Sequence, residues 1–276
     1  MQEKIVHLFL VTDKQNLSNL HVTLVMLLAK ANVDWQYHIY ILFNEVEDSD
    51  KAEILEITQK NKTFKIFFHA INENDFVTDL PSDTPHTSKV GRFKYLIGNF
   101  DIEKALYIDT DILLRADVSE LFQINLDGFI IGAVPDVNNR AFNKTLQLPP
   151  QYNYLNSGVL LIDCVQWKRN RMTERLVEVS IKREKELIYV DQDTFNIVCA
   201  EIGYKKLDLA WNFPAASQYF AHNIFVILKK YWRAYSFSEI IRAFKNPLFV
   251  HFIGKPKPND GNLKTAFAAE YLTYFK

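Results

Sequence analysis

Cysteine is scarce in this sequence of 276 residues, which contains only Cys164 and Cys199. Two cysteines are too few for a disulfide framework, so both are expected to be reduced and buried, as in a cytoplasmic protein. Long apolar runs are also missing, because no window approaches the roughly 18 apolar residues of a membrane span. The short apolar run 5–11 lacks a cleavage pattern and is predicted to be a strand, not a signal peptide.

Charge of one sign and glycine-rich motifs are lacking as well. The formal net charge is −1, so nothing attracts the whole chain to nucleic acid, and no nucleic-acid partner is expected. The sequence has neither the Gly-x-Gly-x-x-Gly of dinucleotide-binding folds nor the P-loop signature. A nucleotide diphosphate bound here would therefore have to be held by a metal ion and cationic side chains.

Apolar segments alternate with helix-forming segments along the chain, and 48% of the residues are hydrophobic, enough for a large core. Strands are predicted at 5–11, 37–43, 64–71, 129–134, 154–163 and 247–252, and helices at 20–28, 50–59 (with Ile54, Leu55 and Ile57 inward), 89–98 and 167–187, the last one solvated. Polar loops are predicted at 79–88 and, as a mobile surface loop, at 138–153. This order predicts an α/β fold with a mainly parallel sheet, whose binding residues gather at the carboxyl ends of the strands.

Two carboxylates interrupt the apolar run 105–114, at Asp109 and Asp111. In a strand both would point to the same side, and burying two like charges calls for a cation. Asp-x-Asp occurs three times in the chain, against roughly one expected by chance, so context decides. Asp48 and Asp50 fit a solvated loop or helix start, whereas Asp109 and Asp111 are the candidates for metal or substrate binding.

Two further polar groups stand beside apolar segments. Asn156, Ser157 and Gly158 lie at the start of the predicted strand, as either a hydrogen-bonding amide with a close-approach glycine or an ordinary turn. Asp191, Gln192 and Asp193 lie at a helix start, where Asp191 could serve as an N-cap. Capping explains Gln192 less well, which favours a functional site.

Residues 219–245 are aromatic and basic, with five cations and only Glu239 as an acid. Ser236 and Glu239 have the spacing of a capping box for a helix that runs toward Lys245. The region is either a packed helical subdomain or a contact for an anionic membrane or amphiphilic acceptor. After it, His251 is followed by a Gly and Lys loop, typical either of a structural histidine or of a metal ligand beside a phosphate contact.

Taken together, the segments 105–111, 156–159, 191–193 and 251–258 resemble glycosyltransferase family 8, and they occur in that family's order. The resemblance implies the GT-A fold, a mixed and mostly parallel sheet flanked by helices, and a retaining enzyme that uses a UDP-sugar and Mn²⁺, with Mg²⁺ as the alternative metal. Bacterial members often build lipopolysaccharide or other surface glycans as galactosyl- or glucosyltransferases.

The same resemblance assigns roles to residues of this chain. The metal ligands are Asp109, Asp111 and His251; the donor-binding residues are Asp13, Arg92, Asp109, Thr110, Asp111, Asp136, Gly254 and Lys257; the catalytic residues are Gln192, Asp191 and Asn156. Two carboxylates and an imidazole suit manganese. The chain departs from the family at Lys14-Gln15-Asn16, where relatives carry an aromatic residue that stacks on uracil, and at Asn259, where relatives carry Trp.

The expected reaction is transfer of a hexose, galactose or glucose, from UDP to a glycan or glycolipid acceptor. Gln192 is a poor nucleophile, which favours front-face attack, with a covalent intermediate on Asp191 as the alternative. Other possibilities are a nucleotide-sugar-binding protein without turnover, a self-glycosylating protein like glycogenin and, less favoured, a metal-dependent phosphohydrolase. Residues 1–258 are expected to form one catalytic domain with a helical acceptor-side region at 215–246, and 259–276 a C-terminal tail or helix. The expected location is the cytoplasm, with peripheral contact to the inner face of the membrane through 219–245.

Overall fold

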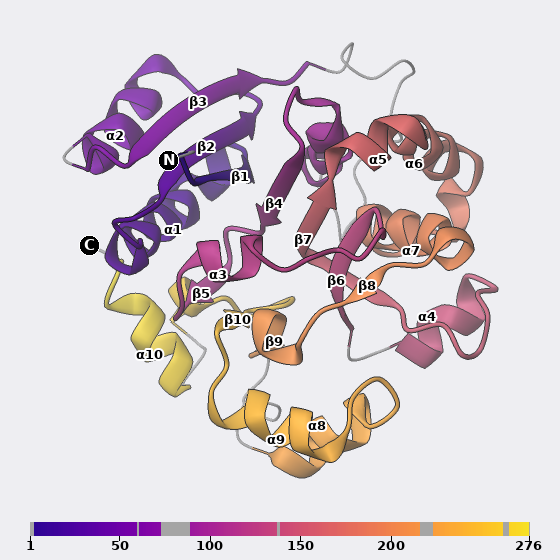
Figure 1. Cartoon of the computed structure of the whole chain (residues 1–276). Coiled ribbons are helices and arrows are strands. Elements are labelled where there is room, and N and C mark those ends of the chain that lie inside the picture. Colours follow the sequence, from indigo (N-terminus) through magenta and orange to yellow (C-terminus); the bar gives the residue numbers. More distant parts are fainter. Residues whose placement is uncertain are drawn as a thin grey trace.

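A computed structural model describes residues 3–59, 61–72, 89–136, 139–215, 223–261 and 265–275. The polar loop expected at 79–88 lies outside these residues. Figure 1 shows a mixed α/β arrangement in which helices flank a central sheet and a smaller sheet lies beside it. Within the described residues, no helix has the length and apolar character needed to cross a membrane.

The larger sheet has seven strands in the order β3-β2-β1-β4-β7-β6-β8. They are β1 (Ile5–Thr12), β2 (Gln36–Phe43), β3 (Phe64–Ala70), β4 (Lys104–Ile108), β6 (Ile131–Pro135), β7 (Leu155–Asp163) and β8 (Lys205–Lys206). β3, β2, β1 and β4 run parallel, and β7 runs antiparallel to both β4 and β6. The mixed, mostly parallel sheet predicted from the sequence is confirmed.

The smaller sheet joins chain-distant strands in the order β5-β10-β9. They are β5 (Ile112–Leu114), β9 (Phe213–Pro214) and β10 (Phe249–His251). β5 follows β4 after only three residues, so the chain passes from one sheet to the other at 109–111.

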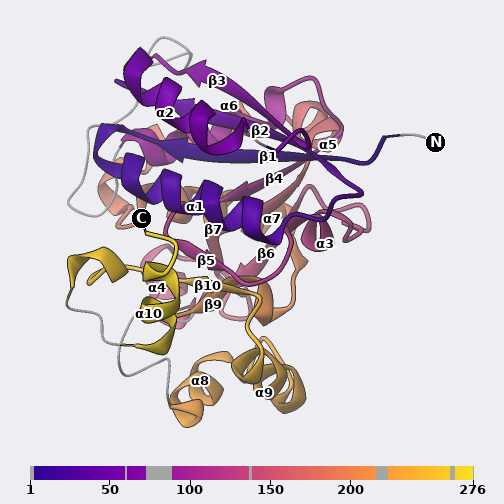
Figure 2. The same ribbon diagram turned by 90° about the vertical axis from the view of Figure 1, so that its left-hand side faces the viewer.

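The helices are distributed along the whole chain. The α-helices are α1 (Leu17–Lys30), α2 (Asp48–Thr58), α3 (Val118–Phe122), α4 (Asn139–Thr145), α5 (Cys164–Arg169), α6 (Met172–Lys182), α7 (Val190–Ile202), α8 (Ile224–Tyr231), α9 (Phe237–Lys245) and α10 (Ala266–Leu272), and 3₁₀ turns occur at η1 (Lys14–Asn16), η3 (Lys89–Asn99), η4 (Glu184–Glu186), η5 (Leu209–Asn212) and η6 (Pro258–Asp260). Seen from the side in Figure 2, α8, α9 and α10 lie at the end of the molecule beside the small sheet.

Alternation along β1 divides the core between the two faces of the sheet. Leu8 and Leu10 pack with α1, α2 and the small sheet, whereas Phe9 packs with η3, α5, α6 and α7. Cys164 and Cys199 are free and buried in the second of these clusters, as expected, and burial raises the pKa of each thiol to about 12. The sheet is therefore covered on both faces.

Three local predictions were wrong. Leu55 of α2 is 46% exposed, and Ile54 alone of the three apolar residues expected inward is fully buried. The segment 138–153, expected to be a mobile surface loop, contains α4, and the Asn143 amide folds it on itself by donating to the carbonyls of Pro149 and Tyr152. The solvated helix expected at 167–187 is two helices and a turn, which bury Trp167, Met172 and Leu176.

Candidate functional site

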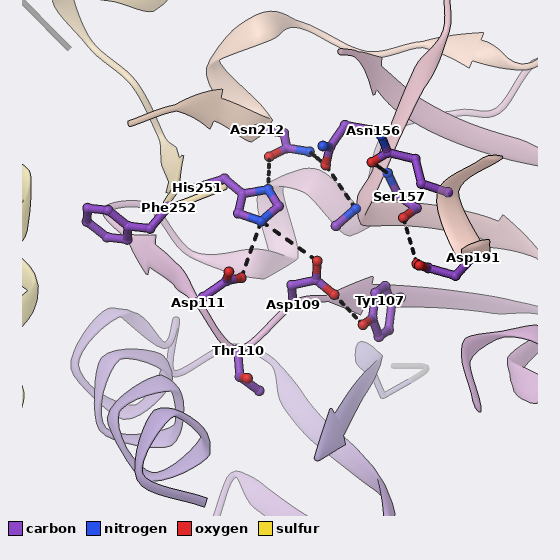
Figure 3. Close-up of polar contacts among 12 residues, drawn as sticks. Tyr107, Asp109, Thr110, Asp111, Asn156, Ser157, Asp191, Asn212, His251 and Phe252 are labelled. Atoms are coloured by element: carbon purple, nitrogen blue, oxygen red, sulfur yellow. Dashed lines mark hydrogen bonds and ion pairs between the residues drawn. The ribbon is translucent and has the colours of Figure 1, made fainter. Parts of the chain in front are cut away.

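The Asp109-Thr110-Asp111 segment lies where the chain leaves β4 and enters β5, not inside one strand as the sequence suggested. β5 pairs antiparallel with β10, with His251 opposite Ile112. This register brings His251 to the two carboxylates: its Nε2 lies 3.2 Å from Asp111 Oδ1 and 3.7 Å from Asp109 Oδ2. The three ligand atoms lie within 4.8 Å of one another, close enough to share one metal ion (Figure 3).

The orientation of the His251 ring is set by Asn212, at the end of η5. Asn212 Nδ2 donates to Asn156 Oδ1 at 2.8 Å, which leaves the Asn212 carbonyl oxygen facing His251 Nδ1 at 2.9 Å. That oxygen can only accept, so Nδ1 carries the proton. The lone pair of Nε2 is then directed at the two carboxylates, the arrangement of a metal-binding imidazole.

The atoms around Asp111 fit a cation. Asp111 Oδ1 is buried and has no well-aligned hydrogen-bond donor among the described residues, although His251 Nε2 is only 3.2 Å away. Two acceptor atoms face each other there, and a proton or a metal ion must lie between them. Burial favours a neutral Asp111, but its contacts with His251 and with the ammonium group of Lys257 outweigh burial and hold the pKa of Asp111 well below its usual value. Lys257 Nζ donates to Asp111 Oδ2 and to the Phe252 carbonyl.

Lys94 on η3 joins the carboxylates to a second group of polar residues. Its ammonium group is buried, 2.7 Å from Asp191 Oδ2 and 3.6 Å from Asp109 Oδ1, and it lies 4.7 Å from the centre of the Tyr107 ring. Burial favours the neutral amine, but Asp109 and Asp191 raise the pKa of Lys94 above its ordinary value. Lys94 is therefore a fixed positive charge between two acids.

Asp136, Asn156 and Gln192 form the other end of the network. Asp136 Oδ2 accepts from Asn156 Nδ2 at 2.9 Å and from Gln192 Nε2 at 3.4 Å. The Gln192 carbonyl in turn accepts from the Ser157 backbone at 3.1 Å, and the Ser157 hydroxyl donates to Asp191. Hydrogen bonds thus connect Gln192 to His251 through Asp136, Asn156 and Asn212.

Gly158 is the point of closest approach to the cluster. A Cβ atom at this position would lie 2.3 Å from His251 Cε1 and 2.7 Å from Asp109 Oδ2, distances that real side chains do not adopt. The Gly158 carbonyl also accepts from the Asp109 backbone at 2.8 Å. Absence of a side chain at Gly158 is what lets β7 pass directly behind the carboxylates and the imidazole.

A cavity of about 220 Å³ opens beside the cluster. It is lined by Asp13, Asn16, Tyr107, Asp109, Thr110, Asp111 and Lys257 among other residues. Asp13 caps the η1 turn through the backbone and side-chain nitrogens of Asn16. Of the other residues selected from the sequence, Arg92 is fully buried on η3 and Gly254 lies in the loop between His251 and Lys257; neither lines the cavity.

Asp191 and Asp193, both at the start of α7, bind different partners. Asp193 accepts from the backbone nitrogens of Ile188 and Tyr189 and from the Tyr154 hydroxyl, so it holds the helix start. Asp191 instead pairs with Lys94 and Ser157. Asp191 is not the N-cap that the sequence offered, because the N-cap residue of α7 is Tyr189, which makes no side-chain capping bond.

Sequence reasoning missed Lys94 and Asn212. Lys94 was visible as a cation beside Arg92 in a predicted helix, but the sequence does not show which of the two points inward to the acids. Asn212 lies 39 residues before its partner His251, in a segment without any catalytic motif. Only the pairing of β9 and β10 brings the two together.

Comparison with known proteins identifies the group to which this architecture belongs. A family model described as glycosyl transferase family 8 matches residues 7–260. General stress protein A of Bacillus subtilis is 24% identical over 279 residues, covering 99% of this chain and 94% of that protein. The lipopolysaccharide 1,2-glucosyltransferase of Escherichia coli is 24% identical over 168 residues, which is 58% of this chain and 48% of that protein.

Solved structures share the fold along nearly the whole chain. The galactosyltransferase LgtC, in complex with donor and acceptor sugar analogues, has a TM-score of 0.79 at 19% identity and is matched over 98% of this chain and 95% of its own. Mouse xyloside xylosyltransferase 1 has a TM-score of 0.64 at 17% identity, over 90% of this chain and 97% of its own. The GT-A fold expected from the sequence is confirmed.

Proposed function

This chain belongs to glycosyltransferase family 8, and from that premise we propose that it is a metal-dependent, retaining hexosyltransferase. It transfers galactose or glucose from a UDP-sugar to a glycan or glycolipid acceptor of lipopolysaccharide or another surface glycan. The observation that carries the proposal is the cluster of Asp109, Asp111 and His251 at the edge of a cavity. Its three ligand atoms lie close enough together to bind one metal ion. The similarity to a lipopolysaccharide glucosyltransferase supports the acceptor class.

The donor set supports Mn²⁺, with Mg²⁺ as the alternative. Two carboxylates and a neutral imidazole leave room for water and phosphate oxygens around a divalent ion. When bound, such an ion neutralises the departing UDP as a Lewis acid. Lys257, which donates to Asp111, would contact the diphosphate, and the cavity that Asp13 and Thr110 line would receive the nucleoside.

The residues around Lys94 suit the sugar. Asn156 and Gln192 present amide groups whose orientation is fixed by Asp136, so they can position the hexose without rearrangement. Asp191 is held by both Lys94 and Ser157, and these bonds stabilise its carboxylate and weaken it as a nucleophile. We therefore favour front-face attack, in which the acceptor oxygen bonds to the anomeric carbon while the bond to UDP breaks, and a phosphate oxygen of the departing UDP takes the acceptor's proton.

The test is UDP release from a panel of UDP-sugars with and without Mn²⁺. UDP-galactose or UDP-glucose is expected to give Mn²⁺-dependent release, and Asp111→Asn is expected to lower it by more than about 100-fold, since Asp111 is a ligand. Release of sugar phosphate in place of UDP, or turnover that survives Asp111→Asn, would contradict the proposal.

The mechanism is tested separately by comparing Asp191→Asn with Gln192→Ala. A glycosyl adduct trapped on Asp191, seen by intact-protein mass spectrometry, would replace front-face attack with a covalent intermediate. A mass gain on another residue after incubation with UDP-glucose alone would favour self-glycosylation.

We further propose that the reaction takes place in the cytoplasm, consistent with two free, buried cysteines. Residues 1–258 are assigned to the catalytic domain, 215–246 to its acceptor side, and 259–276 to a C-terminal extension. Within that extension, α10 packs against Phe252 through Tyr271.

A further inference from the structure

Exposed aromatic side chains concentrate on α8, α9 and the turn that joins them. Phe225 is 78% exposed, Trp232 61% and Phe237 67%. Apart from Val33, no other large hydrophobic residue of the described chain is more than half exposed. Figures 1 and 2 both show the two helices at one end of the molecule, beyond the small sheet.

The exposed face of α8 is distinct from its packed face. Phe225, Lys229 and Trp232 are separated by four and three residues, so they lie along one side of the helix. Ile227 and Tyr231 on the opposite side are fully buried in the core. Packing of α8 against the protein is thus already satisfied, and the aromatic side remains at the surface.

Cations accompany these aromatic residues. The span 223–246 carries five of them, Lys229, Lys230, Arg233, Arg242 and Lys245, against the single acid Glu239. Arg242 pairs with Asp208, and Glu239 is engaged by Ser236 in a capping box. Lys229, Arg233 and Lys245 are exposed, with Arg233 5.1 Å from the centre of the Trp232 ring. This surface is positive although the whole chain carries a formal net charge of −1.

We propose that the outer surface of α8, the 232–236 turn and α9 docks on an anionic phospholipid membrane. Trp and Phe insert at the level of the headgroups, and the ammonium and guanidinium groups meet the lipid phosphates. An acidic protein would satisfy the charge, but three aromatic side chains projecting from separate helical turns suit a fluid interface better than a fixed complement. Docking of this kind would hold the chain near a glycolipid acceptor, yet it does not depend on which sugar, if any, is transferred.

Trp232 provides a direct readout. Of the four tryptophans, Trp167 and Trp211 are buried and Trp35 is half-buried, so Trp232 alone is exposed. Mixing the full chain with vesicles of phosphatidylglycerol and phosphatidylethanolamine is expected to shift its emission to the blue and to sediment the protein, both reversed by salt. Vesicles of phosphatidylcholine alone should do neither.

Matched variants locate the contact. The double variant with Lys229→Gln and Lys245→Gln is expected to bind the vesicles with an affinity about 20- to 30-fold lower than that of the wild type. Lys168→Gln with Arg169→Gln removes the same charge from exposed positions on α5, at the other end of the molecule, and should leave binding unchanged. Phe225→Ser with Phe237→Ser should also weaken binding while Trp232 still reports on it.

Three results would overturn the proposal: no binding to the anionic vesicles, equal binding by both charge variants, or a blue shift without vesicles that grows with protein concentration. The last would assign the surface to a second copy of the chain. Because none of these measurements uses a sugar donor, they stand apart from the outcome of the UDP-release test.

Discussion

At the scale of single residues, the Asp136 carboxylate fixes which group donates and which accepts in each hydrogen bond of the network that leads to His251. The Asp136 carboxylate can only accept, so Asn156 turns its NH₂ toward it and its carbonyl toward Asn212. Asn212 must then donate to Asn156 and accept from His251. An acid remote from the cluster thereby determines which nitrogen of His251 is free to bind a metal.

This chain of bonds predicts that Asn212→Leu weakens binding of Mn²⁺, measured by electron paramagnetic resonance in the presence of UDP, by about 10- to 100-fold. The reason is that Nδ1 loses its acceptor and the ring loses its orientation. Nitrogen NMR of the unliganded wild-type protein should show the His251 proton on Nδ1.

Asn143→Leu serves as the control, because the Asn143 side chain is about as buried as that of Asn212 and, within the described residues, its amide donates to the carbonyls of Pro149 and Tyr152. It should reduce stability and leave Mn²⁺ affinity unchanged. An Nδ1 of His251 found without a proton, or equal Mn²⁺ affinity in Asn212→Leu and wild type, would refute the role of Asn212.

At the scale of elements, β7 is the strand on which the site depends. It runs antiparallel between β4 and β6, and within three residues it supplies Asn156, Ser157 and Gly158 to the network. The apolar run 159–162 predicted the strand, and all four of its residues are buried. The polar residues lie within the strand at its first half and not in a turn before it.

The contact between β7 and the cluster predicts the effect of Gly158→Ala. The added methyl group must displace His251 or Asp109, so Mn²⁺ affinity should fall at least about tenfold and the free energy of unfolding by about 1–3 kcal/mol. Titration calorimetry and urea unfolding measure the two quantities.

Gly128→Ala is a useful comparison. Gly128 has a φ of +87° and open space around its Cβ position, so alanine there costs about 1–2 kcal/mol of backbone strain without touching the cluster. If Gly158→Ala behaved in the same way, losing stability but not Mn²⁺ affinity, close approach at Gly158 would have no role in metal binding.

At the scale of the whole molecule, histidines on the β1-β2-β3 side of the sheet make stability depend on pH. His7 lies beside His38 and bonds to the Tyr40 hydroxyl. Burial, and secondarily His38, lower the pKa of His7 to about 4, and burial also lowers those of His38 and His69. The unfolded chain therefore takes up protons near pH 6.5, where the folded chain does not.

The sign of the effect follows from this difference. The contribution of neutral His7 to the free energy of unfolding is complete above about pH 6.5. It is lost as the pH falls toward about 4. We expect His7→Phe to lose less stability than the wild type between about pH 7 and about pH 4.5, by about 1–2 kcal/mol after allowance for partial exposure of the ring. Urea unfolding at the two pH values measures the difference; equal losses would show that His7 stays protonated in the fold.

By itself, the sequence determined the class of fold and singled out the residues of the cluster. Asp109 and Asp111 could be selected because two carboxylates in an apolar run need a partner, and the resemblance to glycosyltransferase family 8 added His251. The capping box at Ser236 and Glu239 is present as predicted. Alternating strands and helices were sufficient for the mainly parallel sheet, since both signals are local, whereas its mixed character came from the resemblance.

The tertiary structure alone decided how those residues act together. Lys94 reaches both Asp109 and Asp191 from η3, although Arg92 on the same element is buried as well. Asn212 orients His251, and Asp136 orients Asn156, across separations of 39 and 20 residues. Such contacts depend on strand order and register, which residue patterns do not encode locally, whereas the need of Asp109 and Asp111 for a cation is a property of the residues themselves.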